Sequence, residues 1–106
     1  MTETAEPTAR KLFVDVPLDA PLTRGDTTVD TLRLRRPGAG ELRGLSLAKL
    51  LQMDVNEIIR LLPRITQPGL TEHEAGQLDA ADIMEIGGEL ADFFLTTRRR
   101  DELRTM

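Results

Sequence analysis

Apolar and polar residues alternate near the start of the chain, which predicts a β-strand. The apolar face of this segment consists of Leu12, Val14, Val16 and Leu18. A second alternating segment covers residues 28–36, and Gly25 lies in the turn between the two, where it can supply a positive φ. Pro17 and Pro21 cannot donate to a strand ladder, so we expect the first strand to be an edge strand or to contain a bulge.

After Pro37 the apolar residues follow a helical spacing. We expect helices over residues 41–53, from the Asp54 cap to Pro63, from the Thr71 capping box to about Gln77, and from Asp79 through Phe94. The chain therefore predicts an α+β fold in which an N-terminal β-hairpin is followed by a bundle of three or four helices. Residues 1–11 are interpreted as a flexible N-terminal arm, 12–95 as a single domain and 96–106 as a basic C-terminal tail.

The last helix has an unusually wide apolar face. At ~100° per residue its apolar side chains cover roughly 200°, whereas a surface helix needs about 100°. This width suggests burial on two sides, one against the domain's own core and the other against a partner. The sequence leaves open which residues face each side. The candidate partner-binding residues are Ile83, Met84, Ile86, Gly87, Leu90, Ala91, Phe93 and Phe94.

Gly87 and Gly88 each cost this helix about 1 kcal/mol relative to alanine. We expect a closely packed neighbour at Gly87 to offset that cost. The neighbour is either the hairpin or first helix of this chain, or a helix of another chain.

Composition excludes several classes of function. Of 106 residues, 40% are hydrophobic, 30% are charged and none is cysteine, so disulfides and thiolate zinc sites are impossible. Aromatic residues make up 3% and the net charge is −4, which argues against single-strand stacking and against a dedicated phosphate-backbone binder. No apolar run reaches the ~18 residues of a membrane span. We expect no cofactor, no metal, no nucleic-acid partner and no membrane partner.

Charge is segregated along the chain. Residues 71–95 contain seven acids and no Lys or Arg, whereas residues 33–64 contain seven bases and three acids. This pattern favours two solvated faces that attract each other over a role in steering a partner.

The residues that could carry catalysis are isolated. His73 and Ser46 are the only histidine and serine, and neither has a partner that would complete a nucleophile–base pair. Asp82, Glu85 and Glu89 share one helical face, which we interpret as a solvated polar face. The sequence therefore predicts a protein that is not an enzyme.

Residues 45–62 resemble a helix-turn-helix, so a small DNA-binding regulator is an alternative. Two features weaken it. Gln52 stands where the turn usually has glycine, and Asp54 and Glu57 would point negative charge at DNA.

The order of features resembles a known family. The segment 21–37 is similar to its hairpin, 38–42 to the start of its first helix, and Leu70 with Leu78-Asp79-Ala80-Ala81-Asp82-Ile83 to its later "L…L-D-x-x-D" stretch. The family is that of the small tail assembly chaperones of contractile-tailed, Mu-like phages. The resemblance implies a non-enzymatic phage or prophage protein that binds the tape measure protein and keeps it competent for tail tube polymerisation.

The same resemblance implies action in the host cytoplasm, absence from the mature virion and, in many members, a longer form made by programmed frameshifting. The tail tube protein is a further candidate partner. Phe93-Phe94 and Gly87-Gly88 are dipeptides whose codons can form slippery runs. Self-association through the wide apolar face is an alternative to partner binding, with the same sequence signature.

Overall fold

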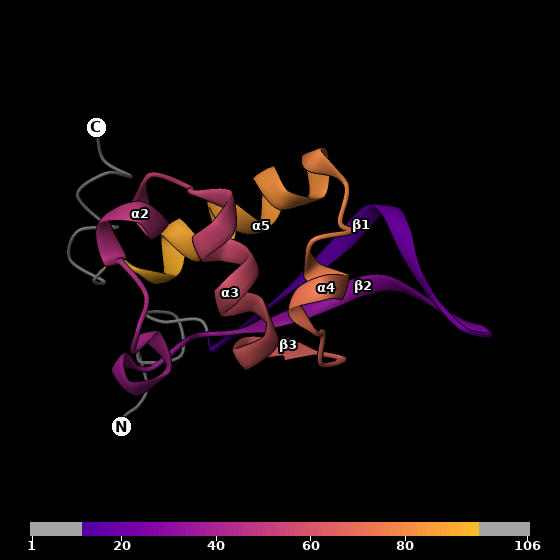
Figure 1. The fold of residues 1–106 in the computed structure, drawn as a ribbon, viewed down its shortest axis with the longest axis horizontal. Helices are drawn as coiled ribbons and strands as arrows, with labels where there is room; N and C mark the ends of the chain where they lie inside the picture. Colours follow the sequence, from indigo (N-terminus) through magenta and orange to yellow (C-terminus); the bar gives the residue numbers. More distant parts are fainter. Residues whose placement is uncertain (1–11, 96–106) are drawn as a thin grey trace, which may run out of the picture.

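A computed structural model describes residues 12–95, which form an α+β domain, as the sequence predicts. The elements in chain order are β1 (Phe13–Arg24), β2 (Thr27–Arg35), the 3₁₀ helix η1 (Ala39–Leu42), α2 (Leu47–Leu51), α3 (Val55–Ile65), β3 (Thr66–Gln67), α4 (Glu72–Ala75) and α5 (Ala80–Phe93). The turn between β1 and β2 projects away from the helices, and α2 lies at the opposite end of the molecule (Figure 1). The expected N-terminal arm (residues 1–11) and basic tail (residues 96–106) lie outside the described residues.

The hairpin has the predicted features. β1 and β2 pair antiparallel from Phe13↔Arg35 to Arg24↔Thr27, and the register shifts between Pro17 and Leu22. Gly25 has a φ of 56°, in the left-handed region that glycine enters without steric cost. Within residues 12–95 the sheet order is β1-β2-β3, so β1 is an edge strand as well as a bulged one.

The third strand was not predicted. β3 consists of Thr66 and Gln67, which pair antiparallel with Leu34 and Arg33 of β2. Two residues are too few to show an alternating pattern in the sequence. The strand is visible only in the structure, where Ile65 and Thr66 are buried at the end of α3.

One face of the sheet and the inner faces of the helices form the core. Leu32, Leu34, Leu61, Leu62 and Ile86 are each 0% exposed. The opposite face of the sheet is open, and there Arg33 donates to Asp15 and lies over the ring of Phe13. The alternation in the hairpin thus separates a buried face from a solvated face.

Two helix boundaries differ from the prediction. The segment 41–53 is not one helix, because Gly44, at a φ of 80°, and the Ser46 cap separate η1 from α2. Pro63 does not end α3, which continues to Ile65. The proline removes a backbone donor, but the two additional helical residues include Ile65, which is buried to 2% exposure, so tertiary packing outweighs local propensity here.

Candidate functional site

The wide apolar face of α5 divides into two sides. The side that belongs to the domain's own core contains Ile83, Ile86, Gly87, Leu90 and Phe93. The other side lies at the surface, where Ala80, Met84 and Gly88 are exposed and Ala91 and Phe94 are half-buried. Of the eight candidate residues, Met84 is thus exposed, Ala91 and Phe94 are half-buried, and the other five are buried, with Ile83 at the edge of the core.

The neighbour of Gly87 comes from the same chain. A Cβ built on Gly87 would stand 2.5 Å from Cε of Met53 and 3.4 Å from Cδ1 of Ile58. Met53 lies in the turn between α2 and α3, so this turn crosses α5 at Gly87. The close neighbour that we expected at Gly87 thus belongs to this chain, and a Cβ at this position would require the flexible end of Met53 to move.

Met53 itself adopts the left-handed conformation, at a φ of 60°. The backbone N–H of Met53 donates to the Leu50 carbonyl at 3.0 Å, and that of Asp54 to the Lys49 carbonyl at 2.9 Å. These two bonds form a Schellman motif at the end of α2. The position that favours glycine is therefore Met53, and not Gln52 as the sequence analysis assumed.

An apolar groove lies between α3, α4 and the first half of α5. Its volume is about 310 Å³ and it is lined by Val55, Ile59, Ala75, Gly76, Leu78, Ala80, Ile83 and Met84. Met84 is 63% exposed and Val55 is 51% exposed, although both are large and apolar. We call this surface the α3–α5 groove.

A second apolar hollow, of about 240 Å³, lies on the other side of the Met53–Gly87 crossing. It is lined by Leu42, Leu47, Leu51 and Phe94. Leu47 and Leu51 are exposed, and the sequence analysis did not separate them from the buried Leu50. Leu50 follows Leu47 by three residues and Leu51 follows it by four, so all three lie on one side of α2 and helical spacing alone does not separate the buried leucine from the exposed ones.

The start of α5 is fixed to the hairpin by a buried carboxylate. Asp79 caps the helix, and its side chain accepts from the backbone N–H of Ala81. Asp82, at 1% exposure, accepts from the backbone N–H groups of Asp19 and Ala20 at 2.7 and 3.0 Å. The expectation that Asp82 lies on a solvated face is wrong, because the bulge in β1 turns these two donors toward α5.

An ion pair fixes α4 to the hairpin. Arg24 donates to both oxygens of Glu74, at 3.0 and 2.8 Å, and to the Gly69 carbonyl. Glu74 also accepts from the backbone N–H of Thr71 in the predicted capping box. The Arg24 guanidinium and that N–H lower the pKa of Glu74 to about 2.

The start of α3 is held in a similar way. The buried Glu57 accepts from the backbone N–H of Ser46 at 2.6 Å and from Arg60 at 3.0 Å, and Arg60 also donates to the Gly44 carbonyl. These bonds tie α3 to the segment before α2. Together with the contacts of Asp82 and Glu74 they set the walls of the α3–α5 groove.

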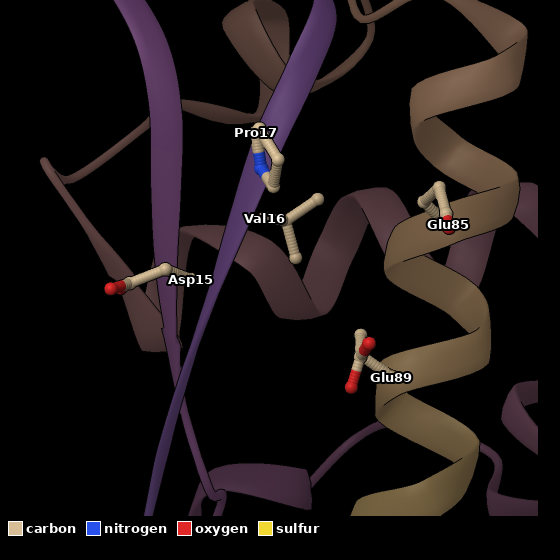
Figure 2. Close-up of a pocket in the computed structure, with 5 residues that line it drawn as sticks. All are labelled: Asp15, Val16, Pro17, Glu85 and Glu89. Carbon is tan, nitrogen blue, oxygen red and sulfur yellow. The ribbon is translucent and has the colours of Figure 1, made fainter.

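An acidic hollow of about 120 Å³ separates β1 from α5, lined by Asp15, Val16, Pro17, Glu85 and Glu89. Glu85 and Glu89 extend from α5 on the side that faces β1, whereas Asp15 points away from α5 (Figure 2). Asp15 is bound by Arg33, which lowers its pKa. The three carboxylates therefore do not converge on one point.

The other residues considered for chemistry have structural contacts. The Ser46 hydroxyl accepts from the backbone N–H of Lys49, and His73 lies 3.3 Å from the side-chain amide nitrogen of Gln77. Among the described residues, no three His, Cys, Asp or Glu side chains are grouped as metal ligands would be. In the same part of the chain, no helix combines the length and the apolar character that a membrane crossing requires.

The helix-turn-helix alternative finds little support in the geometry of α3. At the start of α3 the exposed side chains are those of Val55 and Asn56, and the carboxylates of Asp54 and Glu57 lie at the same end. Asn56 is a side chain that can read a base edge, but the two carboxylates beside it would place negative charge next to the phosphates.

The chain is thus a small α+β domain with an exposed apolar groove between its helices. The family described as "Phage tail assembly chaperone proteins, E, or 41 or 14" matches residues 15–95, and the chain belongs to this family. The resemblance seen in the sequence is thereby confirmed. The family is one of chaperones and not a known class of enzyme.

Two curated relatives come from Escherichia phage P2. The chain is 38% identical to tail assembly protein E over 78 residues, which are 74% of this chain and 86% of that protein. It is 38% identical to tail assembly protein E′ over 80 residues, which are 76% of this chain and 56% of that protein. The chain thus spans little more than half of E′. No solved structure shows significant similarity to this chain.

Proposed function

We propose that this chaperone binds the tape measure protein of its phage through the α3–α5 groove and keeps that protein soluble for tail tube polymerisation. The observation that supports the proposal is the exposure of Met84 and Val55 on the rim of an apolar groove of about 310 Å³. Large apolar side chains at such a place mark a surface that another chain covers. The tail tube protein is a second partner that the same surface could receive.

Co-expression of the chain with the tape measure protein tests this proposal. The variant Met84→Gln/Val55→Gln removes the apolar rim and keeps helix-compatible residues, so it should lower the copurified and soluble tape measure protein at least about tenfold. Leu12→Gln/Phe13→Gln is the matched control, because both side chains are exposed on the hairpin, away from the groove. Full retention by the groove variant, or equal loss by the control, would contradict the proposal.

The other functions are outcomes of the same experiment. A tight dimer in sedimentation, without affinity for the tape measure protein, would reject the chaperone proposal in favour of self-association. Salt-sensitive retention on duplex DNA would favour the regulator.

We also propose that the protein acts in the host cytoplasm and is absent from the mature virion. Mass spectrometry of purified virions and of the lysate tests this directly. Peptides of the chain should occur in the lysate alone.

A longer form made by programmed frameshifting at Phe93-Phe94 is the remaining part of the proposal. The 80 residues matched to E′ are 56% of that protein, whereas the 78 residues matched to E are 86% of it, which is the pattern of a short and a long form. A slip at Gly87-Gly88 would replace the core residues Leu90 and Phe93, whereas a slip at Phe93-Phe94 would keep both. The nucleotides at codons 93 and 94 test this: a run of one nucleotide supports it, and codons that cannot re-pair exclude it.

A further inference from the structure

The end of α5 lies beside α2, and a second apolar surface opens there (Figure 1). Leu47 is 56% exposed and Leu51 is 58% exposed on this surface. Large apolar side chains that share an open hollow are typical of a surface that another segment covers. The hollow has a volume of about 240 Å³, and we call it the α2–α5 hollow; its lining residues are Leu42, Leu47, Leu51 and Phe94.

The chain leaves α5 at the rim of this hollow. Phe94 is the C-cap of α5 and lines the hollow, and the half-buried Leu95 is the last residue that the structure describes. Residues 96–106 follow, and their large apolar side chains are Leu103 and Met106. Residues 1–11, by contrast, have Met1 as their one large apolar side chain. The segment that starts at the hollow is therefore also the one with apolar side chains to fill it.

The length of this segment suits the distance that it has to cover. Leu103 follows Leu95 by eight residues. Eight residues span about 12 Å as a helix and at most about 28 Å when extended, whereas the five residues of α2 span about 7 Å. Leu103 and Met106 are three residues apart, so one helical turn places both side chains on the same side. The two side chains can thus reach the hollow together.

We propose that residues 96–106 fold back against α2 and that Leu103 and Met106 fill the α2–α5 hollow. Their burial removes Leu47 and Leu51 from water, which is favourable in proportion to the apolar area covered. A segment of the same chain is favoured over a separate partner, because its connection at Leu95 gives it a roughly millimolar effective concentration at the hollow. The hollow lies outside the α3–α5 groove, so the proposal does not depend on the proposed function.

Disulfide formation between introduced cysteines tests the proposal in the full chain, which has no native cysteine to compete. Leu51→Cys/Leu103→Cys should form an intramolecular disulfide under mild oxidation at least about tenfold faster than Met84→Cys/Leu103→Cys. Met84 is the matched control because it is as exposed as Leu51, at 63%, but lines the α3–α5 groove instead of the hollow.

Thiol labelling gives the second readout. In the single-cysteine variant Leu51→Cys, adding Leu103→Gln/Met106→Gln should raise the rate of labelling at least about threefold, because the thiol loses its cover. The control Thr97→Gln/Thr105→Gln changes polar residues of the same segment and should leave the rate within about 1.5-fold. Circular dichroism checks that each variant folds, and Leu47→Cys, in the same hollow, replaces Leu51→Cys if that variant does not.

Three results would each overturn the proposal. Equal rates of disulfide formation in the two cysteine pairs would show that the segment does not prefer the α2–α5 hollow. Disulfide-linked dimers in place of the intramolecular bond would show that the occupant comes from a second copy of the chain. A labelling rate that Leu103→Gln/Met106→Gln does not raise would show that these two side chains do not cover the hollow.

Discussion

The carboxylate of Asp82 on α5 accepts the backbone N–H of Asp19, 63 residues earlier in β1, at 2.7 Å. The Ala20 N–H donates to the other oxygen. The stretch Leu78-Asp79-Ala80-Ala81-Asp82 thereby gains a physical meaning: Leu78 is buried, Asp79 caps the helix, and Asp82 holds the bulge. This stretch fixes the direction in which α5 leaves the sheet, and so the wall of the α3–α5 groove.

Asp82→Ala should lower the free energy of unfolding by about 2 kcal/mol, because two N–H groups lose a charged acceptor. Asp82→Asn should be intermediate, since one oxygen remains and the amide adds a donor facing a donor. Glu85→Ala, an exposed position on the same helix, should change stability by less than about 0.5 kcal/mol. Urea unfolding followed by circular dichroism measures all three. An Asp82→Ala protein as stable as Glu85→Ala would show that the bonds from Asp82 to β1 do not stabilise the domain.

The two adjacent glycines of α5 should respond differently to alanine. Gly88 has open space around its Cβ position, so Gly88→Ala should stabilise the protein by about 1 kcal/mol. Gly87→Ala should gain less, because Cε of Met53 must move away from 2.5 Å, a movement that a flexible side chain permits.

Gly87→Leu would overfill the space next to Met53 and Ile58 and should cost about 2 kcal/mol. Thermal unfolding of the three variants measures the order. An equal gain in the two alanine variants would show that the Met53 contact does not reduce the stability gained from alanine at position 87.

The sequence predicted those parts of the fold whose signal is local and periodic. The alternation around Val16 and the turn glycine at Gly25 gave the hairpin, and the caps at Thr71 and Asp79 gave the starts of α4 and α5. The end of α3 was predicted wrongly because the burial of Ile65, a tertiary effect, outweighs Pro63.

The candidate site was predicted only in outline. The excess width of the α5 face was visible in the sequence, but its division into a core side and a surface side depends on where the α2–α3 turn crosses Gly87. Asp82 and the exposed Glu85 are three residues apart, so the helical pattern places both on one face of α5. Only the N–H donors of the β1 bulge distinguish the two. Periodicity reports which residues share a face, and it does not report what packs against that face.

Glu57 should stabilise the segment before α2 locally, through its bond to the Ser46 N–H. Glu57→Ala removes the acceptor of the Ser46 N–H and leaves Arg60 without its carboxylate, so a loss of about 2 kcal/mol is expected. Hydrogen exchange should accelerate at Ser46 and at Lys49, whose N–H is capped by the Ser46 hydroxyl. Exchange at Leu32 and Leu34 in β2 should change only through global stability. Unchanged exchange at Ser46 would show that the bond to Glu57 does not hold the segment.

Acid should destabilise the domain through two ion pairs. The pKa of Glu74 is lowered to about 2 by Arg24 and the Thr71 N–H, and that of Glu41 to about 2 by Arg35 and the Gly38 N–H, both from an ordinary 4.5. Between pH 4.5 and 2 the unfolded chain therefore binds more protons than the folded chain. The stability from these pairs is fully present above pH 4.5 and is lost as pH falls through the folded pKa near 2.

Denaturant midpoints measured from pH 7 to pH 2 should stay level down to about pH 4.5 and then fall. Other carboxylates titrate over the same range, so Glu41→Gln/Glu74→Gln is the variant that isolates these two. It should be less stable than the parent at pH 7 and should lose less stability on acidification, so that the two curves converge toward pH 2. Parallel curves would show that the Arg24–Glu74 and Arg35–Glu41 pairs do not set the acid response.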